Sequence, residues 1–410
     1  MSGNYIEFTK EMAKDYTILV PTMLPTHFKL ITKVLSFYGY KMEILDTTGK
    51  QVVDTGLKYV HNDTCYPAIL VIGQLINAVQ SGKYDVNKIA LMLSQTGGGC
   101  RASNYLSLLR KALKKAGLGH IPVVAFGVAG LEKHSGFNLS IPKLYKMMHA
   151  VFYGDLLMSL VNQVKPYETE HGTAAKLADK WSEKLSGELV KSRISYKKVK
   201  ENYRQIISEY AAIPMNKTEK VKVGVVGEIF VKYSPLGNNN LEQFLYDEGA
   251  EVVVPGLLDF LMYCIFNPIN DAKLYGMNKV KSVACRIGYK FLLSRQKDII
   301  DIMNEDGHFM PPTPFSTTVS LTKGYIGLGT KMGEGWLLTA EMLELAHEGV
   351  KNIICTQPFG CLPNHICGKG MMKPIKEKNE DVNIVAVDYD AGATRVNQEN
   401  RIKLMLANAK

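Results

Sequence analysis

One loop pattern occurs twice in this chain, roughly 260 residues apart. The first copy is Ser94-Gln-Thr-Gly-Gly-Gly-Cys100-Arg-Ala-Ser-Asn104, and the second is Cys355-Thr-Gln-Pro-Phe-Gly-Cys361-Leu-Pro-Asn-His-Ile-Cys367-Gly-Lys-Gly. With one glycine of the first loop counted as an insertion, Gln95 and Cys100 line up with Gln357 and Cys361, and an asparagine follows each cysteine, Asn104 four residues and Asn364 three residues later. We therefore expect two diverged copies of one folding unit, each of which brings a cysteine to the same kind of loop.

The residues around both loops alternate between extended and helical patterns. In the first half we expect strands at 17–21, 41–45, 88–93 and 121–126, with helices at 26–38 and 103–116. In the second half we expect strands at 221–226, 251–254, 352–355 and 382–387, with helices at 241–248 and 397–406. Alternating strands and helices favour parallel sheets. The expected fold class is α/β, with two related doubly wound, Rossmann-like or flavodoxin-like domains.

A helical stretch separates the two halves. Residues from about 141 to 213 are almost wholly helical in pattern, with interruptions at Gly154, Pro166 and Gly187. A chain of 410 residues with 46% apolar residues is too long for one core. We expect an N-terminal α/β domain at 1–140, a helical insert or linker at 141–220 and a C-terminal α/β domain at 221–410. The insert is expected to cover the cleft between the domains or to form a homodimer contact.

The cysteine count favours metal or redox chemistry over structural disulfides. There are seven cysteines, an odd number: Cys65, Cys100, Cys264, Cys285, Cys355, Cys361 and Cys367. The chain begins without the pattern of a secretory signal, so we expect a reducing, cytoplasmic environment. In such an environment clustered cysteines more often bind metal or react than form disulfides. No apolar run is long enough to span a bilayer, and we expect no membrane partner.

Topology predicts where the two loop cysteines lie. In parallel sheets, ligands bind beyond the carboxyl ends of the strands, so Cys100 and Cys361 should face a common cleft. The backbone N–H groups of Gly97-Gly-Gly99 and of the Phe359-Gly360 turn are expected to lower the pKa of the thiols and to donate hydrogen bonds to sulfur. A weaker correspondence pairs Cys65 with Cys264, each expected near a helix terminus after a strand.

Several interpretations of these thiols remain open. Cysteines delivered by separate loops favour an iron–sulfur cluster. Zinc usually shows a repeated Cys-x-x-Cys pair, which this sequence lacks, and thiols without a metal are the third interpretation. Cys285 lies in a helical run and is expected to be a small buried apolar residue. Cys264 suits core packing as well as ligation. His365 is a candidate catalytic proton donor or ligand, or it merely bonds to backbone in its turn.

Other common ligand classes are not expected. The net charge of +10 comes from lysines interspersed with acidic residues, which is typical of solvated helix faces and predicts no nucleic-acid binding. Neither glycine loop has the Gly-Lys-Ser/Thr ending of a phosphate-binding loop. The first loop also follows a later strand of its half, where a dinucleotide fingerprint does not occur. We therefore expect neither an ATP site of that kind nor a nicotinamide cofactor.

Several motifs resemble those of the protein family related to 2-hydroxyacyl-CoA dehydratases and their activases. They are Asn62-Asp-Thr-Cys-Tyr-Pro67, the first loop through Tyr105, Val225-Val-Gly-Glu-Ile-Phe230, and the segment from Cys355 to Lys403. The resemblance covers most of the chain outside the helical insert. Within this family, the length and the cysteine count resemble those of the double-cubane cluster proteins.

The resemblance implies a cofactor, a partner and a reaction. The cofactor would be an 8Fe-9S double-cubane cluster held by six cysteines, for which we select Cys65, Cys100, Cys264, Cys355, Cys361 and Cys367. The partner would be an actin-like ATPase with its own 4Fe-4S cluster, which drives low-potential electrons into this chain. The chain would then be an iron–sulfur oxidoreductase, working under anaerobic conditions, that reduces a small molecule which the sequence does not identify. The alternatives are a 2-hydroxyacyl-CoA dehydratase component with a 4Fe-4S cluster and a non-enzymatic electron-carrying protein.

Overall fold

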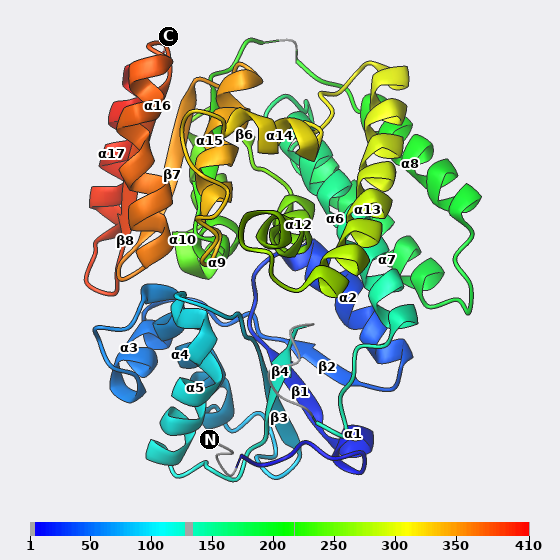
Figure 1. The fold of residues 1–410 in the computed structure, drawn as a ribbon, viewed down its shortest axis with the longest axis vertical. Coiled ribbons are helices and arrows are strands. Elements are labelled where there is room, and N and C mark those ends of the chain that lie inside the picture. The colour runs from blue at the N-terminus through cyan, green and yellow to red at the C-terminus, as the bar shows by residue number, and fades with distance from the viewer. Residues whose placement is uncertain (1–4, 128–133, 217, 410) are drawn as a thin grey trace.

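Two four-stranded parallel sheets form the framework of the chain (Figure 1). The computed structural model describes residues 5–127, 134–216 and 218–409. The first sheet contains β1 (Thr17–Val20), β2 (Lys41–Ile44), β3 (Ile89–Ser94) and β4 (Val123–Phe126), and the second contains β5 (Lys222–Gly227), β6 (Glu251–Val253), β7 (Asn352–Pro358) and β8 (Asn383–Tyr389). Their orders are β2-β1-β3-β4 and β6-β5-β7-β8. Because the two orders correspond strand for strand, the expected α/β class with two related halves is confirmed.

The central strands are buried on both faces. The five residues from Ile89 to Leu93 in β3 are buried, and all seven residues of β7 are buried. Strands that are buried along their whole length are typical of a parallel sheet covered by helices on both faces. In register, Val226 of β5 and Ala386 of β8 flank Cys355 of β7.

The helices of the first half are α1 (Met12–Asp15), α2 (Pro25–Phe37), α3 (Lys50–Tyr59), α4 (Tyr66–Gln80) and α5 (Tyr105–Lys115). The sequence predicts α2 and α5 and a helix terminus near Cys65, where α4 begins, but it does not predict α3. These last two helices pack backbone to backbone: a Cβ atom on Gly73 would lie only 2.2 Å from the carbonyl oxygen of Val52. Glycine at this position therefore permits the contact between α3 and α4.

Three helices fill the range in which the sequence predicts helix between the halves. They are α6 (Ile141–Val164), α7 (Thr173–Leu189) and α8 (Tyr196–Ala211). Pro166 lies in the break between α6 and α7, whereas Gly154 and Gly187 lie inside helices. α6 and α7 pack against α2, and α6 also contacts β6. These helices therefore join the two sheets.

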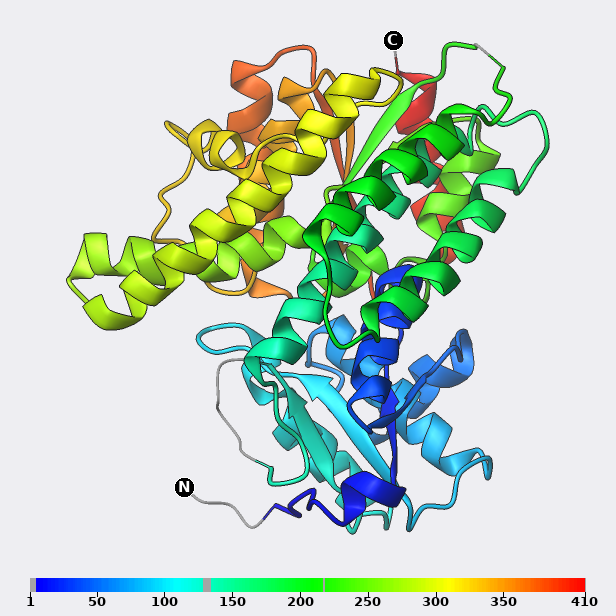
Figure 2. The same cartoon turned by 90° about the vertical axis from the view of Figure 1, so that its right-hand side faces the viewer.

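The second half is richer in helix than the sequence predicts. Its helices are α9 (Ile229–Tyr233), α10 (Pro235–Asn238), α11 (Leu241–Asp247), α12 (Leu257–Tyr275), α13 (Lys279–Asp306), α14 (Phe315–Leu321), α15 (Trp336–His347), α16 (Met372–Lys378) and α17 (Arg395–Ala407). α12 and α13 form an antiparallel hairpin that projects from the side of the molecule (Figure 2). None of the helices in the described part of the chain has the length and apolar character needed to cross a bilayer.

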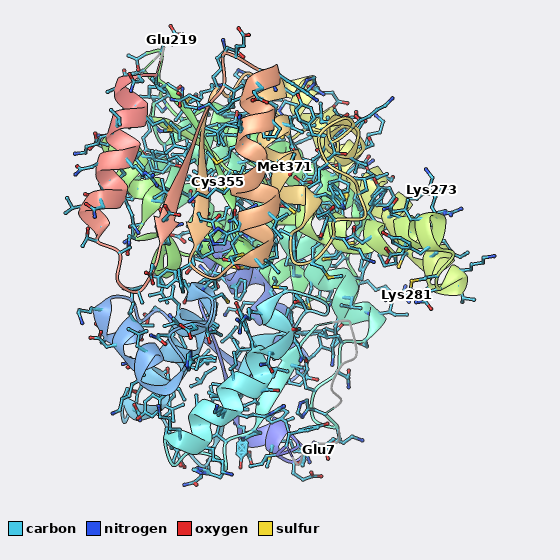
Figure 3. The ribbon with its side chains drawn as sticks, turned by 60° about the vertical axis from the view of Figure 1, so that its left-hand side comes forward. Glu7, Glu219, Lys273, Lys281, Cys355 and Met371 are labelled. Carbon is cyan, nitrogen blue, oxygen red and sulfur yellow. The ribbon has the colours of Figure 1, made fainter. Side chains whose placement is uncertain are left out.

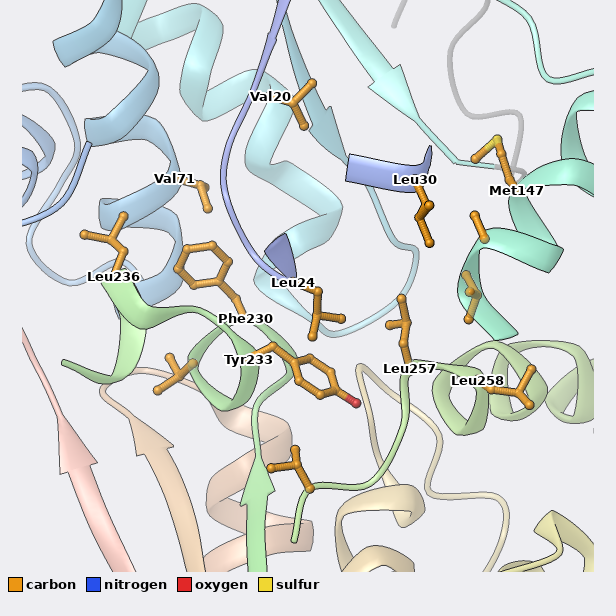
Figure 4. Packing of buried hydrophobic residues seen from close by; sticks show 14 of the residues in the cluster. Val20, Leu24, Leu30, Val71, Met147, Phe230, Tyr233, Leu236, Leu257 and Leu258 are labelled. Carbon is orange, nitrogen blue, oxygen red and sulfur yellow. The ribbon is translucent and has the colours of Figure 1, made fainter. Parts of the chain in front are cut away.

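One apolar core extends across the junction of the two halves. Figure 4 shows Val20, Leu24 and Val71 of the first half close to residues of the second half, among them Phe230, Tyr233, Leu236 and Leu257. A hydrogen bond from the Ser234 hydroxyl to the Thr22 carbonyl, 3.1 Å long, crosses the same junction. The shared core fixes the position of one sheet relative to the other and therefore the position of the loops between them.

Candidate functional site

Cys65 and Cys361, which come from different halves, are brought together by backbone contacts. Cys65 is the N-cap residue of α4, and the next amide, Tyr66 N–H, donates a 3.0 Å hydrogen bond to the carbonyl oxygen of Phe359. Gly360 has φ of +70°, and a Cβ atom there would lie 3.1 Å from Cα of Cys65. The turn that precedes Cys361 therefore packs directly on the start of α4, and glycine permits this approach.

Cys100 reaches the same place from the loop after β3. A Cβ atom built on Gly333 would lie 3.7 Å from Cβ of Cys100 and 2.8 Å from Cγ of Pro363. Gly333 has φ of +60° and thus occupies a conformation that favours glycine. Pro363 follows Cys361 by two residues. Cys100 and the Cys361 loop therefore both pack against the segment that contains Gly333. The two loops predicted to correspond do converge.

The glycine run of the first loop packs against a methionine. The amide of Gly99 donates to Sδ of Met332 at 3.2 Å, and a Cβ atom on Gly98 (φ +83°) would lie 2.2 Å from that sulfur. A side chain at Gly98 would push Met332 away. The glycines therefore hold the first loop against residues 327–335 of the second half.

Each of the three thiols precedes a helical turn. Cys65 caps α4, Cys100 caps the 3₁₀ turn Arg101–Asn104 and receives a long hydrogen bond from Ala102 N–H at 3.5 Å, and Cys361 precedes a helical segment that begins at Leu362. Burial nevertheless raises the pKa of all three thiols, that of Cys100 to about 11. The expected lowering of the pKa is therefore not seen, because loss of hydration outweighs the N–H groups. Metal binding would release these protons.

Two buried carboxyl groups lie beside the thiols. Glu228 follows β5 directly and caps α9, accepting a 2.8 Å hydrogen bond from Val231 N–H. Glu334 accepts a 3.0 Å hydrogen bond from Ile229 N–H. Burial and then the charge of Glu334 raise the pKa of Glu228 to about 8, and burial raises that of Glu334. Burial therefore favours the protonated form of Glu228.

The carboxyl groups are within electrostatic range of most of the cysteines. After burial, negative charge on Glu334 is the next cause that raises the pKa of Cys264, Cys361 and Cys367, and it also acts on Cys100. Glu228 acts on Cys65, Cys100 and Cys361. The hydroxyl of Tyr105 lies 3.1 Å from Sγ of Cys65. These groups share one environment at the carboxyl ends of the two sheets.

Two further cysteines border this environment. Cys367 is buried in the π-helical turn Asn364–Gly368, and its carbonyl accepts a hydrogen bond from the Thr339 hydroxyl at 2.6 Å. Cys264 lies seven residues after Leu257, the first residue of α12, so the expectation that it sits at a helix terminus like Cys65 is wrong. The side chain of Asp155 accepts hydrogen bonds from the amides of Leu257 and Leu258, which fixes the earlier start of the helix. Cys264 itself is exposed to solvent, although desolvation by the surrounding protein raises the pKa of its thiol to about 12.

Cys355, Cys285 and His365 are the remaining candidates. β7 continues to Pro358, so Cys355 lies inside the strand (Figure 3). Its Sγ adjoins the loop that carries Cys361 and Cys367, 3.4 Å from Oδ1 of Asn364 and 3.3 Å from a Cβ atom built on Gly368. Cys285 lies on α13, as its helical pattern predicts, but is only half-buried. His365 is exposed.

The chemistry of the site fits a thiophilic metal centre. All seven cysteines are free thiols, and soft sulfur ligands suit iron–sulfur clusters, zinc and copper(I). Within the described residues, no three Cys, His, Asp or Glu side chains already converge closely enough to form a metal site. The hydroxyl of Thr96, next to the glycine run, is buried and has no hydrogen-bond partner among the described residues.

The sequence interpretation misses Glu228, Glu334 and Tyr105. Two of these residues have a sequence feature that could have marked them as site candidates. Glu228 directly follows a predicted strand, and Glu334 stands between Gly333 and Gly335. Comparison with known proteins gives no match to a family model and none to a curated protein. The site is therefore interpreted from its own chemistry and from the motifs.

Proposed function

We propose that this chain is an iron–sulfur protein that receives low-potential electrons and uses them to reduce a small molecule. The donor would be a separate, ATP-hydrolysing actin-like protein with its own 4Fe-4S cluster. The observation that carries the proposal is the convergence of Cys65, Cys100 and Cys361 from both halves at the carboxyl ends of two parallel sheets. We further propose that it works in the cytoplasm as a homodimer.

The chain's own residues would hold and tune the cofactor. Cys65, Cys100 and Cys361 would bind iron as thiolates, and the proposed ligand set also contains Cys264 and Cys367, whose thiols feel the charge of Glu334. Bound here, a cluster would supply one-electron chemistry at a potential set by burial and hydrogen bonds to sulfur. The Tyr105 hydroxyl at Cys65 is one such hydrogen-bond partner. Glu228 would hold a proton beside the thiols.

The number of thiols available decides between two cluster types. The 8Fe-9S double cubane proposed from the resemblance uses six cysteines, and its set includes Cys355. Cys355 is completely buried in β7 among apolar side chains such as Val226 and Ile353. Its Sγ nevertheless adjoins the loop that carries Cys361 and Cys367, because it lies 3.3 Å from a Cβ atom built on Gly368.

A second candidate function follows from the three thiols that backbone contacts tie together. Three cysteines and one open iron position would suit a 4Fe-4S cluster of the kind proposed for a 2-hydroxyacyl-CoA dehydratase component. A protein that only carries electrons is the non-enzymatic alternative, and it would have the same ligands without turnover.

Iron and sulfide analysis of anaerobically purified protein tests the proposal. About eight irons per chain would favour the double cubane and about four the dehydratase-type cluster. A colourless, zinc-loaded protein with all thiols reduced would contradict both. Turnover of small multiply bonded substrates with the ATPase, in the presence and absence of ATP, separates a reductase from a carrier. Activity only on 2-hydroxyacyl-CoA would establish the second candidate.

A further inference from the structure

The end of the α12–α13 hairpin is an apolar surface that no described residue covers. α12 ends at Tyr275 and α13 begins at Lys279; Gly276 and Asn278, with φ of +67° and +45°, form the short turn between them. Figure 2 shows this end of the hairpin standing away from the body of the molecule. We call residues 273–290 the hairpin tip.

The hairpin tip exposes a cluster of large apolar side chains. The exposed members are Leu274, Tyr275, Met277, Val280, Val283 and Ile287. Val280 is 87% exposed and Ile287 is 68% exposed. On α13, the spacing of 280, 283 and 287 places three of these side chains on one helix face. Soluble proteins seldom leave such a contiguous apolar surface open unless a partner covers it.

The same surface is strongly basic. Its exposed cations are Lys273, Lys279, Lys281, Arg286 and Lys290, and the tip contains no acidic residue. Figure 3 shows Lys273 and Lys281 at the projecting end of the hairpin. Among the described residues, none of these five cations forms an ion pair within the chain. A partner that fits this surface has acidic side chains around an apolar centre.

Hydrogen bonds connect the hairpin to the cysteine site. The Tyr263 hydroxyl donates to the carbonyl of Lys331 at 2.7 Å, and Nδ2 of Asn270 donates to the carbonyl of Leu328 at 3.1 Å. The acceptors belong to residues 327–335, the segment that also carries Met332 and Glu334. α12 is thus fixed along the segment that touches the first glycine loop.

An exposed thiol, that of Cys264, lies on the same helix as the tip. Cys264 precedes Tyr275 by eleven residues, which is about 16 Å along α12. A protein seated on the tip would therefore reach this thiol with its adjacent surface. An electron donor has to approach the acceptor centre closely, and a donor bound at the hairpin tip would be close to Cys264.

From these observations we propose that the hairpin tip is the docking surface for the ATP-hydrolysing electron donor, which meets it with an acidic rim around an apolar centre. This inference rests on the proposed function. A second copy of this chain is a poorer occupant, because a two-fold contact would place five cations against the same five. Nucleic acid would leave the apolar side chains without partners. An anionic membrane would suit the turn but not Ile287, two helical turns back from it.

The binding of the purified ATPase to the full-length chain tests this proposal. Lys279→Glu/Lys281→Glu should weaken the Kd about tenfold at low salt and less at high salt. Val280→Ser/Ile287→Ser should weaken the Kd by a similar factor at low salt and at high salt. The matched controls are Lys111→Glu/Lys114→Glu on α5 and Val396→Ser/Leu404→Ser on α17, which change equally exposed helix positions. The controls should bind within about twofold of the wild-type protein.

The outcomes separate this proposal from the proposed function. If tip variants and controls bind the ATPase equally, the docking surface is wrong and the proposed function stands. If the wild-type chain does not bind the ATPase, the docking surface and the proposed donor are both wrong, whatever the iron content. Iron analysis and dithionite reduction of the same proteins test the cluster independently and show that the variants are folded. Sedimentation of the wild-type chain, and its binding to phosphatidylglycerol vesicles or duplex DNA, complete the test. Loss of self-association, vesicle binding or DNA binding in the tip variants, with ATPase binding unchanged, would assign the surface to that occupant instead.

Discussion

The amide of Tyr66 and the carbonyl of Phe359 form a 3.0 Å hydrogen bond across the junction between the two halves. The two residues stand next to Cys65 and two positions before Cys361, and they are almost 300 positions apart in the chain. This contact places a thiol of one half beside a thiol of the other. The candidate site therefore exists only when both halves are folded and docked.

Gly360 permits this contact, so adding a methyl group there should disturb the site. Gly360→Ala would combine a strained φ with a 3.1 Å approach to Cα of Cys65, and we expect a loss of about 1–3 kcal/mol in the free energy of unfolding together with reduced iron content. Gly349→Ala is the matched control, because Gly349 has φ of +81° but nothing within 4 Å. It should lose similar stability and keep its iron. Equal iron loss in both variants would contradict the role given to this contact.

A buried ion pair supports the second sheet beneath the site. Nζ of Lys232 lies 2.8 Å from Oε1 of Glu341, and both side chains are almost fully buried. Lys232→Met should lower the free energy of unfolding in urea by about 3–5 kcal/mol, because it leaves a buried carboxylate without a partner. Lys297→Met removes the exposed pair with Asp301 and should cost less than about 1 kcal/mol. Similar losses in the two variants would show that the buried carboxyl is protonated or otherwise compensated.

His149 should make the stability depend on pH. The residue is completely buried on α6 against Tyr145, Phe152 and Tyr196, and neither ring nitrogen has a hydrogen-bond partner among the described residues. Burial and then the charge of Arg295 lower its pKa to about 4. The unfolded chain, with a histidine pKa of about 6.5, therefore binds the proton first as the pH falls.

The loss of stability from this histidine falls in a defined window. It begins below about pH 6.5 and ends near pH 4, and it should amount to about 2 kcal/mol between pH 7 and pH 5. His149→Phe should flatten the pH dependence of urea unfolding by about that amount, while His120→Phe, at an exposed position, should not. An unchanged pH profile in His149→Phe would show that the ring is already charged or hydrated in the folded protein.

The sequence is sufficient to predict the sheets but not the helices that surround them. β3 is a buried apolar run and β7 contains the apolar stretch Ile353-Ile-Cys355, each followed by a loop that contains glycine, and that pattern identifies parallel strands without any tertiary information. α12 contains an internal proline, Pro268, and its start depends on Asp155, which lies about 100 residues earlier on α6. Because the capping side chain comes from a distant part of the chain, the sequence around residue 257 does not show that a helix begins there.

The same reason explains which site residues the sequence identifies. Cys100 and Cys361 are predictable because they occupy equivalent loops of two similar halves. Cys355 lies in the strand that the sequence predicts, but that strand continues through Thr356 and Gln357 to Pro358, beyond its expected end at Cys355. Glu334 is missed because it is brought to the thiols by residues 327–335, whose path over α12 is fixed by tertiary hydrogen bonds.

The iron content of two cysteine variants tests the central claim most directly. Cys361→Ser and Cys285→Ser remove one thiol each, the first from the loop that packs on Cys65 and the second from α13. After anaerobic purification, we expect the wild-type protein and Cys285→Ser to be brown, with near-equal iron and acid-labile sulfide, and Cys361→Ser to lose most of both. Full iron in Cys361→Ser, with loss of iron in Cys285→Ser, would contradict the assignment of a metal centre to the junction between the two sheets.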